Sequence, residues 1–138
     1  MAVAAALWSL IFAAVHLAWA GGWYVGLDPV AAAAAFDRPW FLAYDVVVAL
    51  ACLIAAGAFG VMAVNHGGRF RSAAHVVIVM ATGVVAVRAV TGLGALAWRG
   101  FALVSGWDVW FLLGAVLFGA ALRPLSHRDS SAVFDYRR

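Results

Sequence analysis

Long apolar runs alternate with short polar connections along this chain. Four runs, at residues 2–23, 40–65, 73–98 and 105–123, carry few charged side chains. A helix needs about 20 residues to cross the hydrocarbon core of a bilayer, and each run approaches or exceeds that length. Within lipid, a helix satisfies its own backbone hydrogen bonds in one segment. The pattern therefore predicts an all-α fold, a transmembrane four-helix bundle with four spans in one domain, residues 1–123.

The first run has a second interpretation, because Ala18-Trp19-Ala20 followed by Gly21 resembles a signal-peptide cleavage site. However, no positively charged region precedes the run, as a secretory signal would require. We therefore interpret residues 2–23 as a retained span.

The connections also carry structural signals. Asp28-Pro29 is a typical helix start, with a capping carboxylate and a proline at the first helical position. A short interfacial helix is expected over residues 29–36, either as a plain connector or as a lid. Arg123-Pro124 predicts the end of the fourth span, and residues 124–138 are expected to form a polar, mostly unstructured cytoplasmic tail.

The composition supports a membrane protein and excludes a water-soluble domain. Hydrophobic residues make up 67% of the chain and charged residues only 11%, whereas soluble domains carry about 25% charged residues. The arginines flank the apolar runs instead of forming a basic face, so nucleic-acid binding is not expected. We expect a multi-pass protein of the cell's inner or plasma membrane.

The arginines also indicate an orientation, because cytoplasmic connections are enriched in positive charge. With a cytoplasmic N-terminus, only Arg38 and Arg99 fall on the outer side. The cytoplasmic side then holds Arg69, Arg71, Arg123, Arg128, Arg137 and Arg138. This distribution predicts N-in/C-in topology, with the inverted orientation as the alternative.

One arginine lies inside an apolar run. Arg88 cannot lose its charge in a protein, and a charge within a membrane needs partners. Asp45 and Asp108 are expected at a similar depth in the outer half of the bundle, together with His16. The planar guanidinium can hold two carboxylates, and we expect Asp45–Arg88–Asp108 to form one cluster.

Two carboxyl groups in different surroundings can remain one protonated and one ionised, as acid–base enzymes require. The alternative is a purely structural network that fixes helix register.

Aromatic residues accompany this polar set. His16, Trp19 and Trp23 have the spacing of one helix face, although tryptophan also gathers at membrane surfaces for purely interfacial reasons. Aromatic faces beside acidic groups suit a cationic ligand or a carbocation-like transition state. The predicted substrate-binding residues are Trp19, Trp23, Tyr44, Thr91, Trp107, Trp110 and Phe111. No metal-binding pattern or cofactor motif is present in the sequence, so neither is expected.

The first helix carries a recognisable motif, His16-Leu17-Ala18-Trp19-Ala20-Gly21-Gly22. It resembles a large bacterial family of small four-span membrane proteins with an H-x-x-W-A-x-G-G-like pattern near the N-terminus. That family is catalogued mainly as being of unknown function. The resemblance implies the fold and the number of spans, and it implies no activity.

The leading hypothesis is a small membrane enzyme that performs acid–base chemistry on a lipophilic, prenyl or terpenoid substrate, by cyclisation or by epoxide opening and hydrolysis. Asp45 and Asp108 would be acid and base in either order, with Arg88 orienting them and His16 relaying a proton. The alternatives are a non-catalytic accessory subunit of a membrane complex and a small ligand-binding or transport protein. Expected partners are membrane lipids and the lipophilic substrate. The small residues Cys52, Ala56 and Gly60, spaced by four, allow a homo-oligomer.

Overall fold

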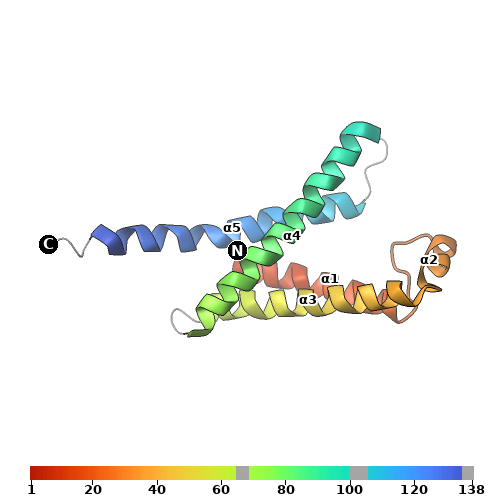
Figure 1. Ribbon diagram of the computed structural model, residues 1–138, viewed down its shortest axis with the longest axis horizontal. Helices are drawn as coiled ribbons and strands as arrows, with labels where there is room; N and C mark the ends of the chain where they lie inside the picture. Colours follow the sequence, from red (N-terminus) through yellow and green to blue (C-terminus); the bar gives the residue numbers. More distant parts are fainter. Residues whose placement is uncertain (65–68, 100–105, 135–138) are drawn as a thin grey trace.

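The protein is helical throughout the part of the chain that its computed structural model describes, which is residues 1–64, 69–99 and 106–134. No strand occurs within these ranges, so the predicted all-α class is confirmed. The helices are α1 (Ala2–Ala20), α2 (Pro29–Phe36), α3 (Pro39–Val64), α4 (Arg69–Arg99) and α5 (Gly106–Phe134) (Figure 1).

Three of the helices are long and apolar enough to cross a membrane. They are α1, α3 and the part of α4 from Phe70 to Gly94. The apolar part of α5, Gly106–Leu122, is shorter than these. Many large apolar side chains face outward on all of them, including Leu50, Val84 and Val87. In a soluble protein such surfaces would be costly to expose, whereas in a bilayer they contact lipid. The described helices therefore indicate a membrane protein with three candidate spans.

Each of the four long helices packs against two of the others. Helix α3 runs antiparallel beside α1, and α5 packs against α1 as well, while α4 crosses the others diagonally and contacts α3 and α5 (Figure 1). The short helix α2 lies where α1 ends and α3 begins. This arrangement brings the C-terminal half of α1, the N-terminal half of α3 and the start of α5 to one end of the molecule, where the polar residues gather.

The core consists mostly of aromatic rings. Trp8 of α1 is buried and stacks on Trp110 of α5, with ring centroids 5.4 Å apart and planes 18° from parallel. Its indole N–H donates to the backbone oxygen of Trp110 at 3.2 Å. Phe118 meets Trp8 edge-on at 5.3 Å and Phe59 of α3 at 4.7 Å. These rings connect α1, α3 and α5.

Gly114 allows α1 and α5 to approach each other closely. A Cβ atom placed there would lie 2.6 Å from Cζ2 and 2.7 Å from Cε2 of Trp8. The absence of a side chain at this position lets the indole lie directly on the backbone of α5. Small residues commonly permit such approaches between helices in lipid.

Several predicted boundaries differ from the structure. Helix α1 ends at Ala20, earlier than the predicted limit at residue 23, because the chain turns at Gly22 with a φ of +86°. Helix α4 begins before the predicted residue 73, at Arg69. Residues 65 and 105, where two predicted spans end and begin, lie outside the described residues.

The helix does not end at the predicted span limit, Arg123, although the apolar part of α5 stops at Leu122. The predicted unstructured tail is wrong as far as residue 134. Helix α5 continues through Pro124 to Phe134. A proline removes one backbone hydrogen bond and can kink a helix as well as end it, and here the helix resumes beyond it. Residues 135–138 of the predicted tail lie outside the described part of the chain.

The predicted short helix is confirmed, with the expected cap. The Asp28 carboxylate accepts a hydrogen bond from the backbone N–H of Ala31 at 2.8 Å, and Pro29 occupies the first helical position. Before this helix, the connection from α1 is fastened at two points. The indole N–H of Trp19 donates to the oxygen of Val25 at 2.9 Å, and Gly26 lies against the ring of Trp107.

Candidate functional site: a buried histidine–aspartate pair

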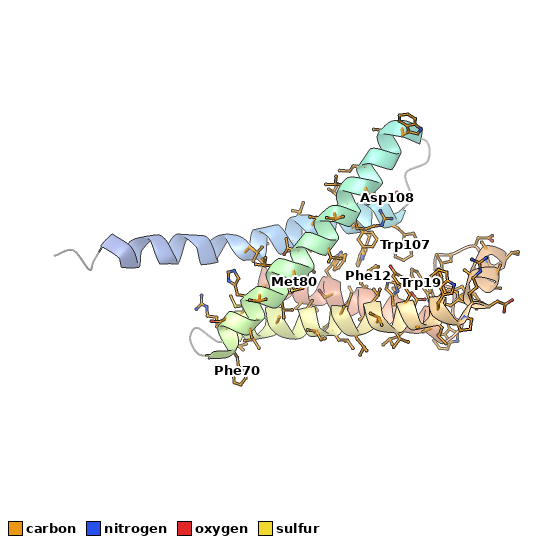
Figure 2. All side chains as sticks on the ribbon, in the orientation of Figure 1. Phe12, Trp19, Phe70, Met80, Trp107 and Asp108 are labelled. Carbon is orange, nitrogen blue, oxygen red and sulfur yellow. The ribbon has the colours of Figure 1, made fainter. Side chains whose placement is uncertain are left out.

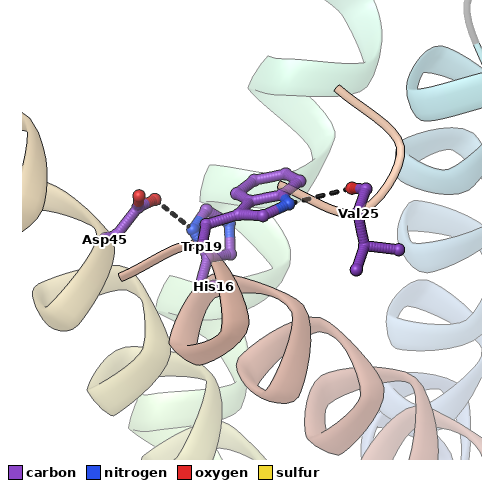
Figure 3. Close-up of polar contacts among 4 residues, drawn as sticks. All are labelled: His16, Trp19, Val25 and Asp45. Carbon is purple, nitrogen blue, oxygen red and sulfur yellow. Dashed lines mark hydrogen bonds and ion pairs between the residues drawn. The ribbon is translucent and has the colours of Figure 1, made fainter. Parts of the chain in front are cut away.

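The closest polar contact in the described residues joins α1 to α3. Nδ1 of His16 lies 2.5 Å from Oδ1 of Asp45 (Figure 3). Both residues are buried, with 4% of His16 and 1% of Asp45 exposed. His16 belongs to the buried face of α1 that also holds Phe12 and Trp19 at helical spacing. Because α3 packs along that face, Asp45 lies directly opposite the imidazole.

Aromatic rings surround the imidazole. Phe12 meets it edge-on at 4.6 Å with an interplanar angle of 88°, and Trp19 meets it at 4.8 Å and 70°. The Trp19 ring is itself held by its hydrogen bond to Val25 (Figure 3). The orientation of His16 is therefore fixed on one side by the carboxylate and on others by rings that form no hydrogen bonds with it.

One oxygen of the pair remains unused. Asp45 Oδ2 is buried and has no hydrogen-bond partner among the described residues. Leaving a buried acceptor unpaired costs about 1–3 kcal/mol, and more when the group is charged. An oxygen in this condition is a strong acceptor for an incoming proton donor, such as a substrate hydroxyl or a water molecule.

A second polar pair joins α4 to the first turn of α5. Nη1 of Arg88 donates to Oδ1 of Asp108 at 3.3 Å, and the guanidinium carbon lies 4.7 Å from the centre of the Phe111 ring. This pair is more open than the first, with 42% of the Arg88 side chain and 23% of the Asp108 side chain exposed. Gly92 leaves space for it, since a Cβ there would come within 2.7 Å of Asp108 Oδ1 and 2.9 Å of Arg88 Nη1.

The predicted cluster of Arg88 with two carboxylates is therefore wrong. Asp45 pairs with His16, and within the described part of the chain the side-chain hydrogen bond of Arg88 goes to Asp108. The reason lies in the order of packing, because α1 lies along α3 whereas α4 meets α5 near Arg88. Similar depth along four helices does not determine which helices are neighbours.

The structure brings three of the predicted substrate-binding aromatics close to the His16–Asp45 pair or its surrounding rings. Trp107 meets Trp19 edge-on at 5.1 Å and lies 6.5 Å from Phe12. Phe12, Trp19 and Trp107 are seen together between α1 and α5 in Figure 2. Phe111 also meets Phe12, at 5.2 Å.

The other predicted residues are exposed or belong to the core. Trp23 falls beyond the end of α1 and is 75% exposed, so it does not share a helix face with His16. Tyr44 is exposed with its ring 6.4 Å from the imidazole. Thr91 is also exposed, and its hydroxyl donates to the backbone oxygen of Arg88 at 2.9 Å. Trp110 contributes to the core through Trp8 and has a buried indole N–H without a partner among the described residues.

Sequence reasoning missed Trp8 and Phe12, which line the same face of α1 as His16. The signal was available, because positions 8, 12 and 16 are spaced by four and must share a face. The predicted site was built from the polar residues, and these two aromatic residues lie nearer the N-terminus than any of them. Within the described residues, no group of three His, Cys, Asp or Glu side chains is placed to hold a metal ion.

Comparison with known proteins gave no match to a family model, to a curated protein or to a solved structure. The resemblance of residues 16–22 to the four-span bacterial family stays a prediction.

Proposed function

We propose that the protein is a small integral-membrane enzyme whose His16–Asp45 pair performs acid–base chemistry on a lipophilic substrate. The observation that carries this proposal is the 2.5 Å contact between Nδ1 of His16 and Oδ1 of Asp45, combined with the unpaired Oδ2 of the same carboxyl group. One oxygen of Asp45 is held by the imidazole, while the other is buried and has no hydrogen-bond partner among the described residues. General acid–base catalysis needs such a positioned proton carrier.

The substrate class follows from the surroundings. The pair lies in an apolar helical protein beside the rings of Phe12 and Trp19, and Trp107 packs against both of these rings. Aromatic faces stabilise developing positive charge, and low polarity strengthens electrostatic interactions within the site. A prenyl or terpenoid molecule bearing an epoxide fits both conditions, because its activation generates carbocation character in an apolar chain.

In the proposed reaction, the His16–Asp45 pair gives one proton to the epoxide oxygen as a carbon–oxygen bond breaks. An alkene of the same molecule, or a water molecule, then supplies the electron pair that forms the new bond at that carbon. The resulting cation loses a proton to the pair, which returns to its starting state. The product is a cyclised isomer in the first case and a diol in the second.

The proposal also adds a fourth span to the three candidate spans. We propose that α5 is a fourth span, with its shorter apolar part followed by a helical cytoplasmic extension, and that both termini are cytoplasmic. The His16–Asp45 pair would then lie in the outer half of the bundle of an inner or plasma membrane protein. Arginine distribution along the chain supports this orientation.

The test compares purified wild-type protein with Asp45→Asn, His16→Gln and Asp108→Asn in detergent micelles. Terminal epoxides of farnesyl and geranylgeranyl esters serve as probes, and mass spectrometry distinguishes isomers from water adducts. Asp108→Asn is the matched control, because this carboxylate belongs to the other pair. We expect Asp45→Asn to lower turnover by about 100-fold or more, and Asp108→Asn to retain it.

Near-ultraviolet circular dichroism establishes that each variant is folded. A folded Asp45→Asn variant with wild-type turnover would show that the pair only fixes the register of α1 and α3. Conversion of no probe by folded wild-type protein would contradict the proposed substrate class.

A further inference from the structure

Arg88 leaves most of its hydrogen-bonding capacity unused. A guanidinium carries five N–H donors, and the hydrogen bonds within the described residues use one, from Nη1 to Asp108. The side chain is 42% exposed, although it belongs to the apolar segment Phe70–Gly94. Donors that face lipid without a partner are costly. The exposed part of the guanidinium therefore requires a polar group from outside the described protein.

The guanidinium is also held in place. Asp108 fixes one end of its fork, and the Phe111 ring lies against the guanidinium carbon at 4.7 Å. Gly92 contributes by leaving the space that the two charged groups occupy. A planar donor fixed in this way loses less conformational entropy on binding a ligand than a free arginine would.

The position of Arg88 places it within reach of the membrane surface. It precedes Gly94, the last residue of the described apolar segment, by six residues, which corresponds to about 9 Å along the helix axis. The predicted apolar run ends four residues later, at Trp98, which makes the distance about 15 Å. Arginine side chains extend toward the surface from such positions, so a lipid headgroup can meet the free donors.

We infer that Arg88, supported by Phe111, is a binding site for a phosphate group at the crossing of α4 and α5. A guanidinium fork matches two phosphate oxygens with parallel hydrogen bonds. The phosphate belongs to a phospholipid headgroup or is free phosphate, and both have the same recognising chemistry. This site does not depend on the proposed activity of the His16–Asp45 pair.

Asp108 does not cancel this attraction, although its carboxylate is a neighbouring negative charge. It lies in the first turn of α5, where the partial positive charge of the helix N-terminus favours an anion. The carboxylate therefore has a second source of stabilisation besides Arg88. The remaining guanidinium donors stay available to the phosphate.

The test uses the full chain in dodecyl maltoside micelles, whose headgroup carries no phosphate, with native mass spectrometry and thermal unfolding as readouts. Three probes are added separately: phosphatidylglycerol, diacylglycerol with the same acyl chains, and inorganic phosphate. The variants are Arg88→Gln, Arg88→Lys and Arg38→Gln. Arg88→Lys retains the charge but loses the fork, and Arg38 is an exposed arginine outside the apolar segments, which makes it the matched control.

We expect phosphatidylglycerol to bind the wild type and Arg38→Gln equally, and to bind Arg88→Gln about tenfold or more weakly, because charge-assisted hydrogen bonds are lost. Arg88→Lys should fall between them, and diacylglycerol should not bind. Competition by inorganic phosphate would assign the site to free phosphate. Equal binding of phosphatidylglycerol to wild type and Arg88→Lys, or diacylglycerol binding as well as phosphatidylglycerol, would overturn the inference. Asp45→Asn should leave phosphate binding unchanged, which separates this site from the proposed active site.

Discussion

Replacement of Gly114 by alanine tests the closest approach between α1 and α5. The added Cβ would lie 2.6 Å from Cζ2 of Trp8, while ordinary contacts of this kind begin at 3.4 Å, so the two must separate by 3.4 − 2.6 = 0.8 Å. The indole has little freedom to move away. It is buried, stacked on Trp110 and bounded by Phe118 and Phe12.

The expected loss follows from three contributions. Overpacking a rigid core costs about 1–3 kcal/mol. Displacement of the indole also weakens its N–H bond to the oxygen of Trp110, a contribution of about 0.5–1.5 kcal/mol. Replacing a glycine inside a helix by alanine stabilises the helix by about 0.5–1 kcal/mol, which offsets part of this loss. Gly114→Ala should therefore lower the free energy of unfolding by about 2 kcal/mol.

The control is Gly119→Ala in the same helix. A Cβ at position 119 meets no atom within 4 Å, so this variant should be neutral or up to about 1 kcal/mol more stable. Unfolding is measured by titration with sodium dodecyl sulfate in mixed micelles, followed by circular dichroism. The combination of Gly114→Ala with Trp8→Phe should recover part of the loss, because the two sites are in contact.

Equal unfolding midpoints for Gly114→Ala and Gly119→Ala would refute this reasoning. Such a result would mean that Trp8 does not lie on the backbone of α5. An absence of coupling between positions 8 and 114 in the double variant would lead to the same conclusion.

Two further predictions concern the connection that leads into α2. Asp28→Ala should destabilise the start of α2 by about 1 kcal/mol, because the amide of Ala31 loses the carboxylate to which it donates. Hydrogen exchange at this amide should become faster, whereas Asp28→Asn should retain the protection. Unchanged exchange in the alanine variant would contradict the cap. Gly26→Ala should lower the thermal stability of the protein more than Gly22→Ala does. Both glycines have a positive φ, but only a Cβ at position 26 meets a ring, that of Trp107 at 3.1 Å. Equal losses would show that Trp107 does not hold this turn.

The helical class and the short helix at residues 29–36 could be predicted because each depends on local information. Run length, apolar composition and the Asp28-Pro29 cap act within a few residues of one another. The end of α5 was not predicted, since the tendency of Pro124 to interrupt a helix does not determine whether the helix resumes. Local signals therefore gave the number and type of helices better than their limits.

The candidate site was predicted only in its parts. His16, Asp45, Arg88 and Asp108 stand out as polar residues in apolar runs, but their pairing depends on which helices are neighbours. Four helices can be arranged in several ways that keep the same depths. The glycines at 92 and 114 were missed for the same reason, since their function depends on a side chain from elsewhere in the chain or from another helix.

The segment between α1 and α2 is attached to two helices at once, through Val25 to Trp19 of α1 and through Gly26 to Trp107 of α5. Trp19 also lies against His16 and against Trp107 of α5. A sideways shift of α5 would therefore displace the Trp19 ring, which lies next to the His16–Asp45 pair. Bilayer thickness changes the tilt of embedded helices, and thinner or thicker membranes should therefore alter the position of this ring. Tryptophan emission recorded in lipids of different chain length would follow that mechanical coupling, and an unchanged spectrum would argue against it.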